Sequence, residues 1–203
     1  MPVPLVLLSD ISGGPFRNTY LGAACFNSHR IRSIVKEFDR KFPDLRKLKG
    51  KDLNVYQLKK IVRFLDKNEV RMRAVSIRGS GWEHYKNNYC DYAEYQEKIF
   101  GIYHFSLVSH TIVRNEGDCS VFICKDNFLS NPERVKKTVN ILKKAHRYNF
   151  RISHGLVKEI PDLRFADYVA SAYRKIGRSL NNFRYFRIII CPHYSLFEKI
   201  FEL

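Results

Sequence analysis

Short apolar runs rich in Val, Ile and Leu alternate along this chain with longer stretches of helical periodicity. A short apolar run bounded by turn residues is typical of a strand, and an apolar stripe every three to four residues is typical of a helix. The predicted strands span 3–9, 18–26, 69–77, 119–125, 150–157 and 185–190. The predicted helices span 29–41, 55–67, 82–112 with a break at Gly101, 132–147, 161–176 and 194–202.

Boundary residues support several of these elements. Asn27-Ser28 and Asn54 precede helical patterns and suit N-caps, and Pro132 suits the first position of a helix. Pro43 and Gly177 follow the ends of helical patterns. We therefore expect well-defined helices after residues 28, 54 and 131.

The order of the elements predicts an α/β fold. Two or three antiparallel strands come first, and the first two are close enough to form a hairpin. The later strands are joined by helical crossovers, which imply parallel pairing. This order resembles an RNase H-like mixed sheet of about five strands flanked by helices, with a helical insertion after strand 2. We expect an RNase H-like domain over 1–180 and a C-terminal extension over 181–203, which packs on the domain or at an oligomer interface.

The charge points to a polyanionic partner. Lys and Arg number 36 against 20 acidic residues, which gives a net charge of +16 and a sequence pI of about 9.7. A field of this sign attracts nucleic acid, RNA or DNA, in a salt-sensitive manner. The alternative is a generically basic surface.

The cysteines and apolar runs predict a cytoplasmic protein. The five cysteines are scattered without a Cys-x-x-Cys, as expected for reduced core residues. A zinc site is the alternative, with ligands Cys119, Cys124, His146 and His154. The apolar runs are too short to span a membrane, and the N-terminal run lacks the features of a signal peptide.

Three aspartates lie where exposure to water explains them poorly. Asp10 follows the apolar run 3–9, Asp126 ends the fourth predicted strand, and Asp167 flanks the apolar stripe of helix 161–176. The small residues Ala166 and Ala170 in that stripe predict a close approach to the sheet, so Asp167 is expected to point at or near it. In a sheet of this order the first and fourth strands are neighbours and the last helix packs across them. The three carboxylates would then repel one another unless divalent cations lie between them.

Hard oxygen ligands favour Mg²⁺ or Mn²⁺, and two such ions promote hydrolysis of a phosphodiester. Asp10, Asp126 and Asp167 are therefore the predicted metal ligands and catalytic residues. Each also has a structural alternative: Asp10 accepts backbone hydrogen bonds at a strand end, Asp126 caps a turn, and Asp167 pairs with Arg164 or Arg174.

Motifs around these residues resemble the RNase H-like "domain of unknown function 3800" family. The match to its Asp-Glu-Ser-Gly is Asp10-Ile11-Ser12-Gly13, and Lys47-Leu48-Lys49 resembles its Glu-x-Lys. Asp126 matches an Asp at the end of a later strand, and Arg164-Phe165-Ala166-Asp167-Tyr168 is similar to its Gln-x-Ala-Asp element. The resemblance covers about residues 3–176 and implies a metal-dependent nuclease fold.

The sequence departs from the family at acidic positions. Ile11 and Lys47 stand where the family has glutamates, and Arg164 stands where it has glutamine. A fourth carboxylate would come from Asp44, Asp52, Glu94 or Glu97. Without one, metal affinity and catalysis are expected to be weakened or absent.

Basic side chains near these motifs are the candidate phosphate ligands. The loop over 40–51 is rich in lysine and arginine, and Lys125 adjoins Asp126. The predicted nucleic-acid-binding residues are Arg46, Lys47, Lys49, Lys51, Lys125 and Arg164. The aromatic residues of 82–105 suit either the core or base stacking, the basic face of helix 132–147 suits either phosphates or solvent, and His154 suits either the core or a role near the metals.

Three functions follow from these features. The first is a nuclease that uses Mg²⁺ or Mn²⁺. The second is a catalytically weakened or inactive nucleic-acid-binding module within a ribonucleoprotein or other complex, which Ile11 and Lys47 favour. The third is an interaction protein that forms a homodimer or larger complex through the apolar tail 183–203.

Overall fold

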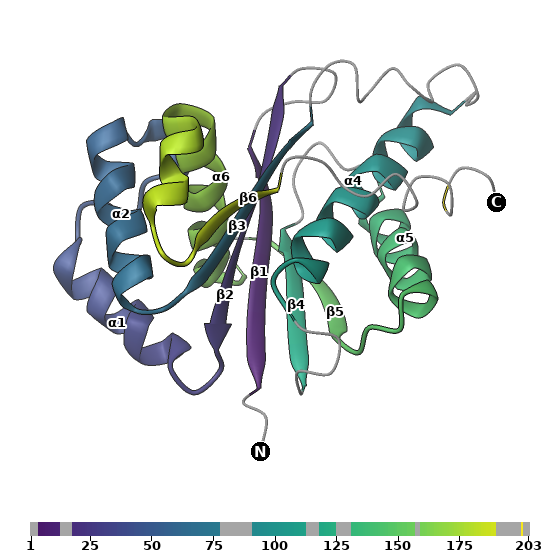
Figure 1. Ribbon diagram of the computed structural model, residues 1–203, viewed down its shortest axis with the longest axis horizontal. Helices are drawn as coiled ribbons and strands as arrows, with labels where there is room; N and C mark the ends of the chain where they lie inside the picture. Colours follow the sequence, from purple (N-terminus) through teal and green to yellow (C-terminus); the bar gives the residue numbers. More distant parts are fainter. Residues whose placement is uncertain are drawn as a thin grey trace.

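A six-stranded mixed sheet forms the centre of the computed structural model (Figure 1). The structure describes residues 4–12, 18–77, 91–112, 118–124, 131–156, 159–189 and 200. The strands are β1 (Leu5–Ser12), β2 (Thr19–Asn27), β3 (Arg71–Ile77), β4 (Cys119–Cys124), β5 (Arg151–Gly155) and β6 (Phe186–Ile189). Their order in the sheet is β5-β4-β1-β2-β3-β6.

The pairing of the strands confirms the predicted RNase H-like arrangement. β2 is antiparallel to both β1 and β3, whereas β4 is parallel to β1 and β5 is parallel to β4. β6 adds a sixth strand parallel to β3, from a segment that the sequence assigned to a C-terminal extension. The predicted helix 194–202 lies almost entirely outside the described residues, and association through the tail stays a prediction.

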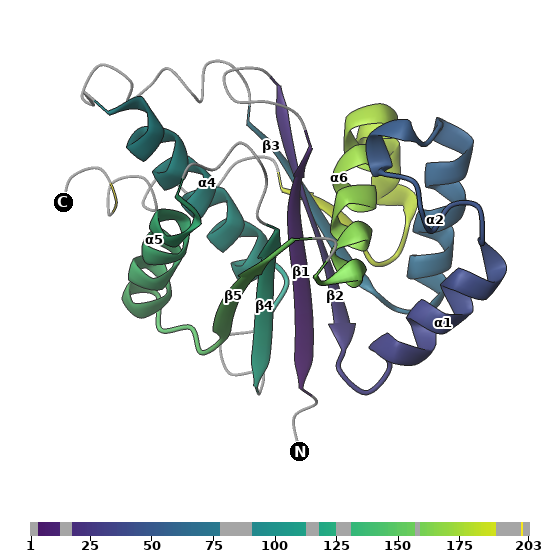
Figure 2. The same ribbon diagram turned by 180° about the vertical axis from the view of Figure 1, so that it is seen from behind.

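Helices cover both faces of the sheet. Figures 1 and 2 show α1 (Ile31–Lys41), α2 (Val55–Lys67) and α6 (Arg164–Ile176) on one side. On the other side lie α4 (Tyr92–Ser109) and α5 (Pro132–Ala145). Short 3-10 turns at Gly50–Asp52, Pro161–Leu163 and Gly177–Asn182 complete the elements. Within the described ranges, no helix is long and apolar enough to cross a membrane.

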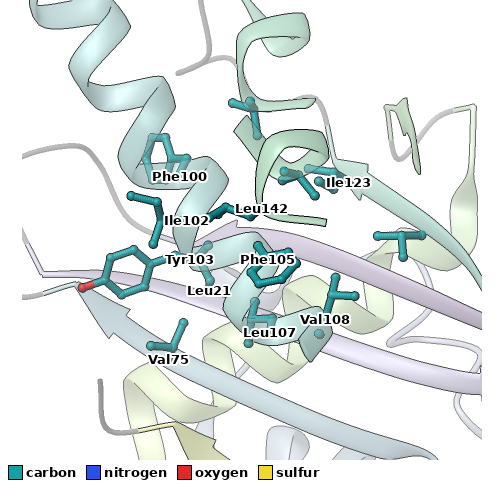
Figure 3. Close-up of a cluster of buried hydrophobic side chains, with 14 of the residues drawn as sticks. Leu21, Val75, Phe100, Ile102, Tyr103, Phe105, Leu107, Val108, Ile123 and Leu142 are labelled. Atoms are coloured by element: carbon teal, nitrogen blue, oxygen red, sulfur yellow. The ribbon is translucent and has the colours of Figure 1, made fainter. Parts of the chain in front are cut away.

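Each face has its own hydrophobic core because side chains alternate along the strands. Leu7 and Ile11 of β1 pack with α4 and α5, whereas Leu8 packs with α6 and the α1–α2 pair. Figure 3 shows Phe100, Tyr103 and Phe105 of α4 in the first core. Tyr95 is buried there as well, so these aromatic residues are core residues. Trp82, Tyr85 and Tyr89 lie outside the described residues.

Local signals explain most helix ends. Asn54 and Gln57 form a capping box at α2, and Asn131 with Pro132 begins α5. The N-cap predicted at Asn27-Ser28 is wrong. Asn27 Oδ1 accepts from the backbone N–H of His29, so it closes a turn before α1 begins.

The break predicted at Gly101 is also wrong. α4 continues through Gly101, where a Cβ would lie 2.6 Å from Thr138 Cγ2 of α5. The glycine permits close packing of the two helices and leaves the helical hydrogen bonds intact. A sequence pattern records the missing side chain but not the neighbour that requires it.

Candidate functional site

Asp10 lies within β1 on the face covered by α6. The strand continues to Ser12, beyond the predicted end at residue 9, because the ladder to β2 continues through Asp10–Gly22 to Ser12–Tyr20. The Asp10 side chain is only 6% exposed, and its Oδ1 accepts a 2.7 Å hydrogen bond from the Ile11 N–H. The sequence thus predicted correctly that this carboxylate is buried.

Gly22, the partner of Asp10 in the ladder, lets α6 approach the sheet. A Cβ at Gly22 would overlap the Ala170 backbone nitrogen and lie 2.9 Å from Ala170 Cα. Paired residues of an antiparallel ladder point to the same face, so Asp10 also points toward α6. The close approach that the small residues Ala166 and Ala170 predicted is confirmed.

A chain of hydrogen bonds joins β1 to Asp167. Ser12, two residues after Asp10 and on the same face, lies 3.4 Å from Ser171 through their hydroxyl oxygens. The Ser171 hydroxyl donates to Asp167 Oδ1 at 3.3 Å, and the Gly50 N–H donates to Oδ2 at 2.6 Å. The predicted partners of Asp167, Arg164 and Arg174, are replaced by a hydroxyl and a backbone amide.

Burial raises the pKa of Asp167 above its ordinary value. Desolvation is the main cause, while the hydrogen bonds from Gly50 and Ser171 and the nearby charge of Lys49 act in the opposite direction. The ionised carboxylate is therefore less stable here than in water. A bound cation would compensate for that lost hydration.

The third predicted ligand follows β4. Ser9 of β1 is aligned with Ile123, so Cys124 ends β4 beside Asp10 and faces the same core as α6. Asp126 and Lys125 come directly afterwards and lie outside the described residues. Their predicted roles, ligand and phosphate contact, stay predictions.

The donors on this face suit a hard cation, although the described part of the chain holds no ready cluster. Carboxylates from Asp10 and Asp167 and hydroxyls from Ser12 and Ser171 are all oxygen donors, as Mg²⁺ and Mn²⁺ prefer. Among the described residues, no three His, Cys, Asp or Glu side chains gather to hold a metal. That finding overturns the alternative zinc site at Cys119, Cys124, His146 and His154.

The candidates for a fourth carboxylate are spread over the molecule. Asp52 is exposed near Asp167 and raises its pKa. Glu97 is buried on the α4 side, where it accepts from the Asn131 N–H at 2.6 Å and lies 3.5 Å from Arg134. Glu94 pairs with Lys98 at 3.1 Å, and Asp44 is exposed. Asp52 is thus the candidate whose charge acts on Asp167.

Side chains of α6 hold the basic loop beside Asp167. The Tyr168 hydroxyl donates to the carbonyl oxygens of Leu45 and Leu48, and Lys175 donates to those of Lys51 and Leu53. A Cβ at Gly50 would lie 2.8 Å from the Asp167 carbonyl oxygen. Close packing against α6 is therefore why glycine suits this position.

The predicted phosphate ligands fall into two groups. Arg46, Lys47, Lys49 and Lys51 are exposed on the loop. Arg164 has a side chain only 11% exposed, pairs with Asp39 at 2.8 Å and donates to the Arg46 carbonyl oxygen. In this structure Arg164 positions the loop.

His154 lies on the other side of the sheet. It is buried in β5, with its Nδ1 3.9 Å from a Glu133 carboxylate oxygen. His104 of α4 is fully buried nearby and shares a 2.8 Å hydrogen bond with Ser9. Burial first, and then the charge of His154, lowers the pKa of His104 to about 3. These histidines belong to the core that faces α4 and α5.

Three features of the site escaped the sequence reasoning. The hydroxyls of Ser12 and Ser171 connect β1 to α6, and Gly22 makes room for the helix. The spacing of Asp167 and Ser171 by four residues, one helical turn, was the available signal. Their pairing with Ser12 depends on the sheet register, which no local pattern specifies.

The sheet order, the crossovers and the position of α6 define an RNase H-like fold. Solved structures agree with this: the PCNA:RNase HII complex from Archaeoglobus fulgidus matches with a TM-score of 0.54 and 12% identity, over 88% of this chain and 78% of that one. Ribonuclease H2 from Pyrococcus horikoshii OT3 matches with a TM-score of 0.51 and 15% identity, over 89% and 77%.

Bst-RNase HIII in complex with Mn²⁺ matches with a TM-score of 0.53 and 14% identity, over 88% of this chain and 53% of that one. The chain thus spans about half the length of the Bst-RNase HIII chains it matches. At these identities the similarity shows the fold. No protein-family model and no curated protein matches the sequence.

Proposed function

We propose that this protein is a nuclease that uses Mg²⁺ or Mn²⁺ to hydrolyse phosphodiester bonds in nucleic acid. The observation that carries the proposal is the hydrogen-bonded chain Ser12–Ser171–Asp167 on the α6 face of the sheet, where Asp10 shares a strand face with Ser12 and an exposed basic loop lies next to Asp167. The RNase H-like fold, and a structural neighbour in complex with Mn²⁺, support the metal chemistry.

The chain's own residues would bind and orient the substrate strand. Lys47, Lys49 and Lys51 lie on a loop whose backbone is hydrogen-bonded to α6, and the charge of Lys49 acts on Asp167. Asp10 and Asp167, with Asp126 as the third ligand, would hold the metal. When bound, a divalent cation activates water and stabilises the leaving oxygen.

Cleavage of labelled RNA, DNA and RNA–DNA hybrid by the purified protein in Mn²⁺ tests the proposal. We expect Asp10→Asn to reduce the rate by about a hundredfold or more, since loss of even a supporting group costs a metal site roughly that much. Asp118→Asn, an exposed acid at the opposite end of β4, is the matched control and should cleave normally. An Asp10→Asn protein as active as the wild type would show that the site is elsewhere.

A binding module without cleavage is the second candidate. Ile11 packs in the apolar core on the α4 side, and Lys47 is exposed on the loop. The family that the motifs resemble has glutamates at both positions. Neither residue supplies an acid to the α6 face. Salt-sensitive binding with no metal-dependent cleavage by the wild type would favour this candidate. The predicted homodimer or larger complex is likewise a proposal.

A further inference from the structure

The helical insertion between β2 and β3 has a strongly basic outer surface. All twelve lysines and arginines between positions 31 and 67 are exposed, whereas only Asp44 and Asp52 of the five acids there are. The insertion lies on the same side of the sheet as α6 (Figure 2). Its surface therefore suits a polyanion next to the candidate site.

Helix α2 concentrates this charge in one stripe. Its inner face buries Leu58, Ile61, Val62 and Leu65. The outer stripe, at helical spacing, consists of Tyr56, Lys59, Lys60, Arg63 and Lys67, all exposed. An aromatic ring thus heads a row of four cations without an acid among them.

Tyr56 is unusual because a large aromatic side chain normally gains stability from burial. It is 64% exposed, and Lys60 Nζ lies 4.4 Å from the centre of its ring. The large hydrophobic residues exposed in the described part of the chain are Leu48, Val55, Tyr56 and Ile141, so most of them gather over residues 48–56. Apolar contact area and positive charge are combined at this place.

The stripe is continuous with the candidate active site. The loop that leads into α2 is hydrogen-bonded to Asp167 through Gly50 and to Lys175 through Lys51 and Leu53. Asn54 then caps the helix, and Tyr56 follows in its first turn. A strand lying along the loop from Tyr56 would therefore pass Asp167.

We infer that the surface formed by Tyr56, Lys59, Lys60, Arg63 and the basic loop binds a single-stranded segment of nucleic acid, with one base stacked on Tyr56. A single strand exposes the faces of its bases, whereas a duplex stacks those faces inside and offers its backbone and the base edges in its grooves. Single-stranded nucleic acid would then be the substrate class of the nuclease, and this role as a substrate rests on the proposed function. The binding itself needs no metal.

Fluorescence anisotropy in EDTA, with labelled single strands of about 12 nucleotides, tests the inference. Tyr56→Ala should weaken binding about tenfold, while Tyr56→Trp should bind at least as tightly as the wild type. Tyr56→Ala should not change binding of a blunt duplex or of an abasic strand of equal charge. Since Tyr56 is exposed, unchanged melting temperatures should confirm that the variants are folded.

Charge is tested separately with matched lysines. Lys59→Ala with Lys60→Ala should weaken binding of the single strand and of the abasic strand. The control is Lys137→Ala with Lys144→Ala, which removes the same charge from exposed positions of α5 on the other side of the sheet. This control should bind like the wild type.

Several results would overturn the inference. They are a Tyr56→Ala protein that binds like the wild type, equal losses on single and double strands, no binding at low salt, or equally strong competition by polyglutamate. The proposed nuclease fails separately. Binding that depends on Tyr56 without any cleavage removes only the nuclease, whereas cleavage that Tyr56→Ala leaves unchanged, together with unchanged binding, removes only this inference.

Discussion

Asp167 is a partly buried carboxylate that holds the basic loop through a hydrogen bond. Its Oδ2 accepts from Gly50, and its Oδ1 accepts from Ser171. The sequence predicted that Asp167 points toward the sheet, because it flanks an apolar stripe with small alanines. It did not predict the donors: Gly50 lies on a loop 117 residues away in the chain, and Ser171 lies one turn further along the same helix.

Replacing Asp167 should separate stability from activity. Because its pKa is raised, the native state binds the proton of Asp167 more tightly than the unfolded state does. The ionised carboxylate therefore lowers the free energy of unfolding at neutral pH. This loss disappears below both pKa values, where Asp167 is protonated in both states. Asp167→Asn removes this charge and keeps an acceptor for Gly50. We expect it to be at least as stable as the wild type at pH 7, with cleavage lost.

Asp167→Ala is the comparison, since it leaves the Gly50 N–H without its acceptor. It should lower the free energy of unfolding by about 1–2 kcal/mol. Urea denaturation at pH 7 measures both variants. Equal losses for Asn and Ala would show that the charge itself holds the loop.

His104 should make the protein sensitive to mild acid. Its pKa falls from 6.5 to about 3 on folding, because burial disfavours the charged imidazole. The free energy of unfolding therefore has its full value above pH 6.5, where the side chain is neutral in both states. It declines as the pH falls toward 3, by up to about 1.4 kcal/mol per pH unit. His104→Gln should flatten this decline, whereas the exposed His29→Gln should not. Unfolding free energies measured between pH 7 and pH 4 test this, and parallel curves for wild type and His104→Gln would contradict it.

At the scale of elements, the sheet and most helices follow from local signals. The helix over 55–67 was predicted at its exact observed bounds, because Asn54 caps it and its apolar stripe is unbroken. The errors occur where a residue far away in the chain sets the local structure. β1 extends to Ser12 because β2 pairs with it that far. Gly101 lies inside α4 because a side chain there would overlap Thr138 of α5, and not because the helix ends.

The contact between β2 and α6 gives an element-scale prediction. Gly22→Ala places a methyl group against the α6 backbone, which cannot rotate away as a side chain could. It should lower the free energy of unfolding by about 3 kcal/mol. Gly177→Ala meets no atom within 4 Å but keeps a φ of 70° and a ψ of −144°, which L residues rarely adopt, so it should lower stability by about 1–3 kcal/mol through backbone strain alone. Thermal and urea unfolding measure both variants. A Gly22→Ala protein as stable as the wild type would mean that α6 is not held against the sheet.

At the scale of the whole molecule, the two faces of the sheet differ in their chemistry. Both faces bury aromatic side chains, but the α4–α5 face also holds His104 and His154, whereas the α6 face carries two predicted metal ligands, Asp10 and Asp167, beside a basic insertion. Element order predicted the fold, whereas the nucleic-acid partner predicted from net charge stays a proposal. The link from Ser12, on the strand face of Asp10, through Ser171 to Asp167 required the three-dimensional register.

The central claim is that the α6 face binds a divalent cation through Asp10 and Asp167. Calorimetric titration of the full-length protein with Mn²⁺ tests it most directly. We predict binding to the wild type and to Asp118→Asn, and at least about tenfold weaker binding to Asp10→Asn and Asp167→Asn. Equal affinity of all four proteins, or no binding of Mn²⁺ by the wild type, would contradict the claim.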